Sequence, residues 1–161
     1  MRKFIFIAAI LSSITFFACG GGTTSPQAFN GTAIDIFKEA NKTLDEFDSK
    51  ITAGVKSSDL SSIAEAAESA LEKVDGNIEK LKAINAPQSA EKYKESVLKS
   101  LDEVKAVIES GKKYAALTEG YSKSEFNALE KEYNKKRKQL SNELKNVATA
   151  QAEFMKAISA K

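Results

Sequence analysis

Apolar residues recur at alternating steps of three and four along four successive segments, the spacing of an amphipathic α-helix with one apolar side. In the first segment this apolar seam consists of Ala33, Phe37, Ala40, Leu44, Phe47 and Ile51. Similar seams run through residues 60–81, 97–115 and 126–158. No stretch alternates apolar and polar residues for long enough to indicate a β-strand. The pattern therefore predicts an all-α fold.

Turn and capping residues separate the four segments. Gly54 stands where the first seam stops, as expected of a left-handed residue after a helix. Pro87 suits the first turn of a helix, and Gly120 closes the third segment. Ser122 and Glu125 have the spacing of a capping box. We therefore predict helices over residues 31–54, 58–85, 88–119 and 122–159.

The predicted connections are short, and helices joined by short turns run antiparallel to their neighbours. We therefore expect residues 29–161 to form an up-down-up-down antiparallel four-helix bundle, elongated and packed like a coiled coil. Gly76 is the position at which the second helix could kink or split, because glycine within a helix costs about 1 kcal/mol.

The start of the chain has a different character. Arg2 and Lys3 precede a largely apolar run over residues 4–17, interrupted by two serines and a threonine. As a helix this run would rise about 21 Å, whereas the hydrocarbon core of a bilayer is about 30 Å thick. The arrangement is typical of a cleaved signal peptide, here residues 1–18, rather than of a membrane-spanning anchor.

Cys19, the single cysteine of the chain, follows that run directly. It has no second cysteine for a disulfide, and no His or nearby carboxylate for a metal site. The stretch Phe16-Phe17-Ala18-Cys19 resembles the lipobox of bacterial lipoprotein precursors. Ala18 and Cys19 match its most constrained positions, Phe16 replaces the usual leucine, and Phe17 is bulkier than the usual small residue. The resemblance implies cleavage after Ala18 and a diacylglycerol together with an N-acyl chain on Cys19.

The resemblance also implies a location, the cell envelope, with the protein held at the membrane by its lipid. Residues 19–28 are rich in glycine and hydroxyl side chains, so we expect them to form the lipidated N-terminus and a flexible tether. In lipoproteins of hosts with two membranes, an aspartate after the modified cysteine commonly favours the inner membrane. Gly20 lacks that signal, so the outer membrane is favoured in such a host.

Charge and residue content exclude several function classes. Arg2 and Lys3 account for the whole formal net charge of +2, so the body is balanced and offers no overall field to attract nucleic acid. The chain has no histidine, which removes the base of a nucleophilic triad, a haem ligand and the Glu-x-x-His pairs of di-iron bundles. We therefore expect no enzyme, no catalytic residue, no metal and no cofactor apart from the lipid.

The densest basic run in the chain consists of Lys135, Lys136, Arg137 and Lys138. It could contact anionic lipid headgroups, a glycan or an acidic protein, or it could be a solvated helix face balanced by neighbouring glutamates. In this region the seam lapses, and Lys136 or Arg137 falls inward. This side chain could form a polar layer that fixes register, mark a spot where the bundle opens, or, as the simplest interpretation, run its stem back to water.

Gly111, Ala115 and Ala116 leave the third helix thin near one end, which indicates either a small apolar pocket or close helix packing. Two functions fit these features. The first is a non-catalytic, lipid-anchored protein that presents helical surfaces to an envelope protein or glycan. The alternative is a module that holds a small apolar or amphipathic ligand between its helices. A filled interior favours the first function, and an enclosed apolar cavity of roughly a few hundred Å³ favours the second.

Overall fold

The computed structural model describes residues 23–117 and 120–160, and these are helical apart from short connections. Two 3-10 helices, η1 (Gln88–Ala90) and η2 (Lys113–Ala116), flank the third of four α-helices. The α-helices are α1 (Pro26–Ser57), α2 (Ser61–Ala83), α3 (Glu91–Lys112) and α4 (Lys123–Ser159). No β-strand occurs in the described residues, so the prediction of an all-α fold is confirmed. Cys19 and the predicted signal peptide lie outside the described residues.

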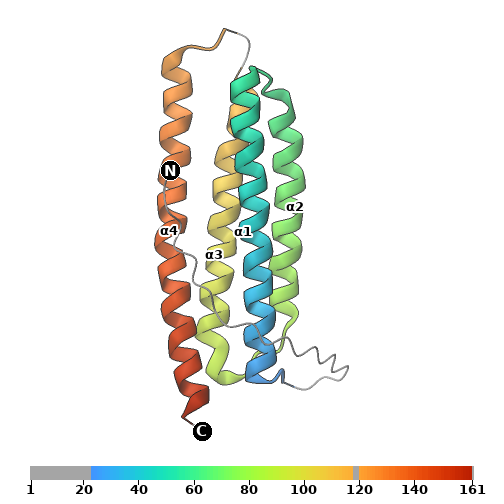
Figure 1. Cartoon of the computed structure of the whole chain (residues 1–161), viewed down its shortest axis with the longest axis vertical. Coiled ribbons are helices and arrows are strands. Elements are labelled where there is room, and N and C mark those ends of the chain that lie inside the picture. The colour runs from blue at the N-terminus through green and yellow to red at the C-terminus, as the bar shows by residue number, and fades with distance from the viewer. Residues whose placement is uncertain (1–22, 118–119, 161) are drawn as a thin grey trace.

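The four helices lie side by side along the long axis of the molecule, with α2 and α4 outermost in the view of Figure 1. Helix α1 packs on α2 and α3, and α2 also packs on α3. Helix α4 packs chiefly on α3. Helix α4 is therefore a peripheral helix, and its outer side faces away from the other three.

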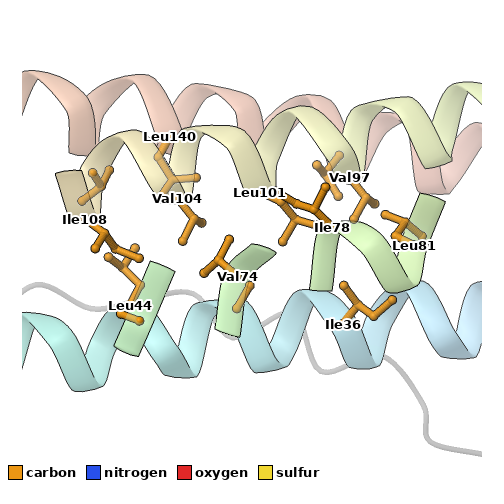
Figure 2. Packing of buried hydrophobic residues seen from close by; sticks show 14 of the residues in the cluster. Ile36, Leu44, Val74, Ile78, Leu81, Val97, Leu101, Val104, Ile108 and Leu140 are labelled. Atoms are coloured by element: carbon orange, nitrogen blue, oxygen red, sulfur yellow. The ribbon is translucent and has the colours of Figure 1, made fainter. Parts of the chain in front are cut away.

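The core is formed largely by the predicted seams, and Figure 2 shows how its side chains meet in the interior. Residues outside the seams also contribute, among them Ile36, Tyr93 and Val107, whereas Phe37 of the first seam is only partly buried. Helices α1, α2 and α3 supply most of the buried residues, whereas α4 buries only Leu140, Val147 and Phe154 among its 37 residues. These three are spaced by seven residues and lie along one line of the helix. The contact that α4 makes with the rest of the molecule is therefore narrow.

Two groups of aromatic rings hold α4 to the rest of the molecule near its ends. Phe29 of α1, Tyr93 of α3 and Phe154 of α4 have ring centroids 5.7–6.1 Å apart. Towards the other end, Tyr114 lies 5.5 Å from Phe126 and 6.1 Å from Tyr133, again between ring centroids. Such pairs contribute about 0.5–1.5 kcal/mol each beyond the apolar area that they bury.

The start of α1 corrects the prediction of a tether through residue 28. The Ser25 side chain caps the helix by accepting a hydrogen bond of 3.3 Å from the backbone N–H of Ala28, and Pro26 occupies the first turn. This arrangement is a favourable helix start, because proline has no N–H to leave unpaired and its φ already suits the helix. The backbone N–H of Thr24 also donates to the carbonyl of Asn85 at 2.9 Å. Residues 26–28 thus belong to the folded body.

The end of α1 also differs from the prediction, because the helix continues past Gly54 to Ser57. Ser58 adopts the left-handed conformation instead, with φ of 60°. Gly54 is buried, and a Cβ built on it would lie 2.8 Å from the carbonyl oxygen of Asp59 and 3.1 Å from Cδ1 of Ile63. This glycine therefore permits the close return of the chain onto α1 rather than the end of the helix.

The predicted boundaries of the second and fourth helices lie within three residues of the observed ones, whereas the third, predicted over residues 88–119, is an α-helix only over Glu91–Lys112, with the 3-10 helices η1 and η2 on either side. Helix α2 is continuous through Gly76, so this glycine does not break it. The capping box at the start of α4 is confirmed, since Ser122 Oγ accepts from the Glu125 N–H at 3.2 Å and the Ser122 N–H donates to Glu125 Oε2 at 2.7 Å. Gly120 has φ of 86°, but the third helical segment already ends at Ala116 with Leu117 as its cap, so the prediction that Gly120 closes this segment is wrong.

Candidate functional site

The basic run that could contact an anionic partner or form a solvated face is divided between two sides of α4. Successive residues of an α-helix are separated by about 100° around its axis, so four consecutive cations do not share one face. Lys135 and Lys138 are exposed, whereas Lys136 and Arg137 are partly buried. The four residues therefore do not form a single patch.

Arg137 is turned inward and joins a polar cluster between α4 and α1. Its Nη1 lies 2.8 Å from Oδ2 of Asp48, and the Tyr133 hydroxyl donates to the other oxygen of the same carboxylate. The Arg137 and Asp48 side chains are only 28% and 27% exposed. The lapse in the α4 seam is thus occupied by a polar layer with a defined partner on α1. A partly buried polar pair between two helices favours the one register in which its partners meet.

Burial and the neighbouring groups shift the pKa values of the Asp48 cluster in opposing directions. Burial raises the pKa of Asp48 above its usual value, and Asp45 adds to the rise, while the Tyr133 hydrogen bond and the Arg137 charge oppose it. Burial, followed by the hydrogen bond to Asp48, raises the pKa of Tyr133. Tyr133 therefore remains a neutral donor, and all three polar groups are used within the molecule.

The outer side of α4 carries a line of exposed lysines, which we call the basic stripe: Lys131, Lys135, Lys138 and Lys145. It faces away from the buried Leu140 and Val147, and it extends for about 21 Å. None of its members makes an ion pair within residues 23–117 and 120–160. Glu132, one of the glutamates expected to balance this region, instead pairs with Lys113 at 2.7 Å. Lys131 and Lys145, which the run of consecutive charges did not reveal, belong to this surface.

Of the three small residues predicted to leave this helix thin, Gly111 is closely packed, whereas Ala115 and Ala116 of η2 line a shallow groove. A Cβ built on Gly111 would lie 2.6 Å from Cε1 of Phe47 and 2.7 Å from Cδ1 of Ile51. A shallow groove of about 550 Å³ lies nearby and is lined by Ala64, Leu71, Glu109, Lys112, Lys113, Ala115 and Ala116. A smaller hollow of about 150 Å³ lies between α1 and α2. Charged side chains line both hollows, unlike the enclosed apolar cavity expected for a ligand held between helices.

Asn77 is a buried polar residue that sequence reasoning missed. Its side chain is 0% exposed, and neither its Nδ2 nor its Oδ1 has a hydrogen-bond partner among the residues that the structure describes. Its position in the second seam, three residues after Val74, is the signal that could have identified it as a core residue. Within the described ranges, no three His, Cys, Asp or Glu side chains are grouped so that they could hold a metal ion.

No α-helix in the described part of the chain has the length and apolar content needed to cross a membrane. Comparison of the chain with protein-family models, with curated proteins and with solved structures gives no match. What the protein does must therefore be inferred from its own residues.

Proposed function

We propose that this protein is a lipid-anchored lipoprotein of the cell envelope, with a non-catalytic body that has a structural or partner-binding role at the membrane surface. In this proposal residues 1–18 are a signal peptide, and Cys19 becomes the N-terminus and carries the diacylglycerol and N-acyl chains. The observation that carries the proposal is the position of Cys19, directly after a short apolar run and a few residues before a folded helical body. A host with two membranes would hold it in the outer membrane.

The body, in this proposal, is an elongated up-down-up-down antiparallel four-helix bundle. Phe29, near the start of α1, lies 6.1 Å between ring centroids from Phe154, near the end of α4, which supports opposite directions for these helices. Asp48, late in α1, pairs with Arg137, early in α4, in agreement with this. The short connections between α1 and α2 and between α2 and α3 support the same topology.

The anchor would hold the body close to the bilayer. The chain from Cys19 to the capping residue Ser25 can span at most about 20 Å, whatever its conformation. A body this close to the membrane can meet the membrane surface, a neighbouring envelope protein or a glycan. The unpaired lysines of the basic stripe give it an exposed surface for such a contact.

Replacement of Cys19 tests the anchor. Wild-type protein in membrane fractions should give an N-terminal peptide that begins at Cys19 and carries the mass of the acyl chains. The Cys19→Ser variant should carry no acyl chain and should leave the membrane once its signal peptide is removed. Thr23→Ser is the matched control, because it lies outside the lipobox and should behave as wild type. An unacylated wild-type N-terminus, or a precursor that remains uncleaved, would refute the proposal.

A further inference from the structure

The outer side of α2 carries a line of negative charge that matches the basic stripe in spacing. Glu65, Glu72 and Glu79 are exposed and lie seven residues apart, so they project from nearly the same side of the helix; we call them the acidic stripe. In the basic stripe, Lys131, Lys138 and Lys145 are also seven residues apart.

The acidic stripe is largely unpaired within the molecule. Among the residues described, Glu65 and Glu72 make no ion pair, and Glu79 pairs only with Lys82 of its own helix, at 3.2 Å. Helices α2 and α4 are the outermost helices in Figure 1; α2 packs mainly on α1 and α3, and α4 packs chiefly on α3. Because both stripes face outward, one molecule cannot bring its own stripes together.

Contacts of α3 place the two stripes at the same level along the molecule. Lys112 pairs with Glu68 of α2 at 3.1 Å, and the next residue, Lys113, pairs with Glu132 of α4 at 2.7 Å. Glu68 and Glu132 therefore lie at nearly the same height on different sides of α3.

Helices α2 and α4 run in the same direction, so residues that follow Glu68 along α2 stay level with residues that follow Glu132 along α4. Lys105, seven residues before Lys112, pairs with Asp75, seven residues after Glu68, so α2 runs opposite to α3. Helix α4 also runs opposite to α3, because Tyr93 at the start of α3 stacks on Phe154. The three level pairs, matched to within about two residues or about 3 Å, are Glu65 with Lys131, Glu72 with Lys138, and Glu79 with Lys145.

We propose that the acidic stripe of one copy docks against the basic stripe of a second copy, so that the protein forms rows of parallel, side-by-side molecules. This inference rests on the proposed lipid anchor, which would hold every copy the same way up in one membrane. A translation without rotation then brings each glutamate opposite its lysine. Because the two contacting surfaces are different, the contact can repeat from copy to copy.

The contact is expected to form at a membrane and to be sensitive to salt. Exposed ion pairs contribute little in water, so three of them do not hold freely diffusing copies together. Anchoring confines the copies to a surface and raises their effective concentration. The screening length falls from about 8 Å at physiological ionic strength to about 3 Å at 1 M salt, so high salt should separate the rows.

Disulfide crosslinking in membranes that contain the full, lipidated chain tests the register directly. Gly76 lies between Glu72 and Glu79, and Asn142 lies between Lys138 and Lys145; both are exposed. No atom lies within 4 Å of a Cβ built on Gly76, so a cysteine fits there. The double variant Gly76→Cys, Asn142→Cys should give a ladder of dimers and longer species on mild oxidation.

Matched control variants distinguish crosslinking at the proposed register from crosslinking by chance collision. Either single cysteine should give no ladder, because the proposed contact places different surfaces together. Gly76→Cys with Asn127→Cys should also give at least ten-fold less crosslinking, since Asn127 is exposed on the same helix but about 22 Å away along its axis. Equal crosslinking of the matched and shifted pairs would overturn the proposal.

Reversing the charge of each stripe tests whether the partner of the basic stripe is the acidic stripe of a second copy. In the double-cysteine chain, changing Lys131, Lys138 and Lys145 to glutamate should abolish the ladder, and also changing Glu65, Glu72 and Glu79 to lysine should restore it. Restoration of the ladder supports a second copy as the partner. Binding to an anionic lipid or an acidic protein, once lost by reversal of the lysines, would not be restored by reversal of the glutamates. A ladder that survives the first reversal, or is not restored by the second, overturns the proposal. Circular dichroism verifies that each variant keeps its helical content.

Different experimental outcomes refute the proposed lipid anchor and the proposed row of molecules. Acylation and membrane fractionation of the same samples report the anchor independently of crosslinking. An acylated, membrane-bound chain without a ladder refutes the row alone. An unacylated chain without a ladder refutes both proposals. A ladder from an unacylated chain supports pairing of the stripes and refutes the anchor.

Discussion

Gly111 lies near the end of α3, where the helix backbone is in close contact with two side chains of α1. A Cβ at this position would lie 2.6 Å from Cε1 and 3.0 Å from Cζ of Phe47, and 2.7 Å from Cδ1 of Ile51. Carbon atoms in favourable contact are about 3.5–4.0 Å apart. The Gly111→Ala change would therefore push α1 and α3 apart or force the Phe47 ring and the end of Ile51 to move.

The magnitude follows from two opposing effects. Alanine is favoured over glycine within a helix by about 0.5–1 kcal/mol. Overpacking of a filled core typically costs about 1–3 kcal/mol, and Phe47, only 1% exposed, cannot turn out to solvent. We therefore expect Gly111→Ala to lower the free energy of unfolding by about 1–2 kcal/mol and the thermal midpoint by about 3–8 °C.

Gly76→Ala is the matched control, because Gly76 is also within a helix but a Cβ there meets nothing within 4 Å. That variant should be more stable than wild type by about 0.5–1 kcal/mol. Urea unfolding followed by far-ultraviolet circular dichroism measures both changes. If Gly111→Ala were as stable as Gly76→Ala, the close contact between α1 and α3 would be refuted.

Three further changes have defined expected outcomes. Asn77→Leu should raise the free energy of unfolding by about 1–2 kcal/mol, because it removes a fully buried amide without hydrogen-bond partners; a loss in urea unfolding would contradict this. Arg137→Gln should raise the pKa of Asp48 further, as measured by NMR titration. Because ionised Asp48 loses its cationic partner, the variant should be less stable than wild type at neutral pH, and the difference should vanish once Asp48 is protonated, below its raised folded-state pKa. Ser122→Ala should cost about 0.5–2 kcal/mol through loss of the α4 cap. It should raise the lowered pKa of Glu125 only in part, because the backbone N–H of residue 122, the larger cause, is retained; an unchanged pKa would exclude a contribution from the Ser122 side chain.

The helices could be predicted from the sequence because their seams and caps are local. Ser122 and Glu125 lie three residues apart, and their capping box depends only on that spacing. The predicted boundaries of α1 were wrong because its start and its end depend on features outside the repeating apolar pattern. The Ser25-Pro26 start was hidden in a stretch of glycine and hydroxyl residues, and Gly54 serves a contact with Ile63 that becomes visible only when α2 is in place.

The basic surface of α4 could be predicted only in part, because the positions of its residues also depend on contacts with other helices. Lys135 to Lys138 are adjacent in sequence, but the helix turns them to different sides. The inward position of Arg137 follows from Asp48, a residue on α1 that the seam of α4 does not reveal. The matching level of the acidic and basic stripes depends on the side-chain pairs that α3 makes with both outer helices, and no local pattern contains that information.

The polar cluster around Asp48 bears on the proposed rows because it concerns the rotation of α4 about its own axis, and that rotation decides which lysines face outward. A partly buried ion pair contributes little to net stability, but it distinguishes one helix register from another. Because Arg137 points toward Asp48, the helix geometry directs Lys131, Lys138 and Lys145 outward, at the level of the acidic stripe. A slip of α4 by one residue would turn the basic stripe by about 100° and shift it by about 1.5 Å. The Asp48–Arg137 pair, weak as a source of stability, would thereby determine whether one copy can present its lysines to the glutamates of the next.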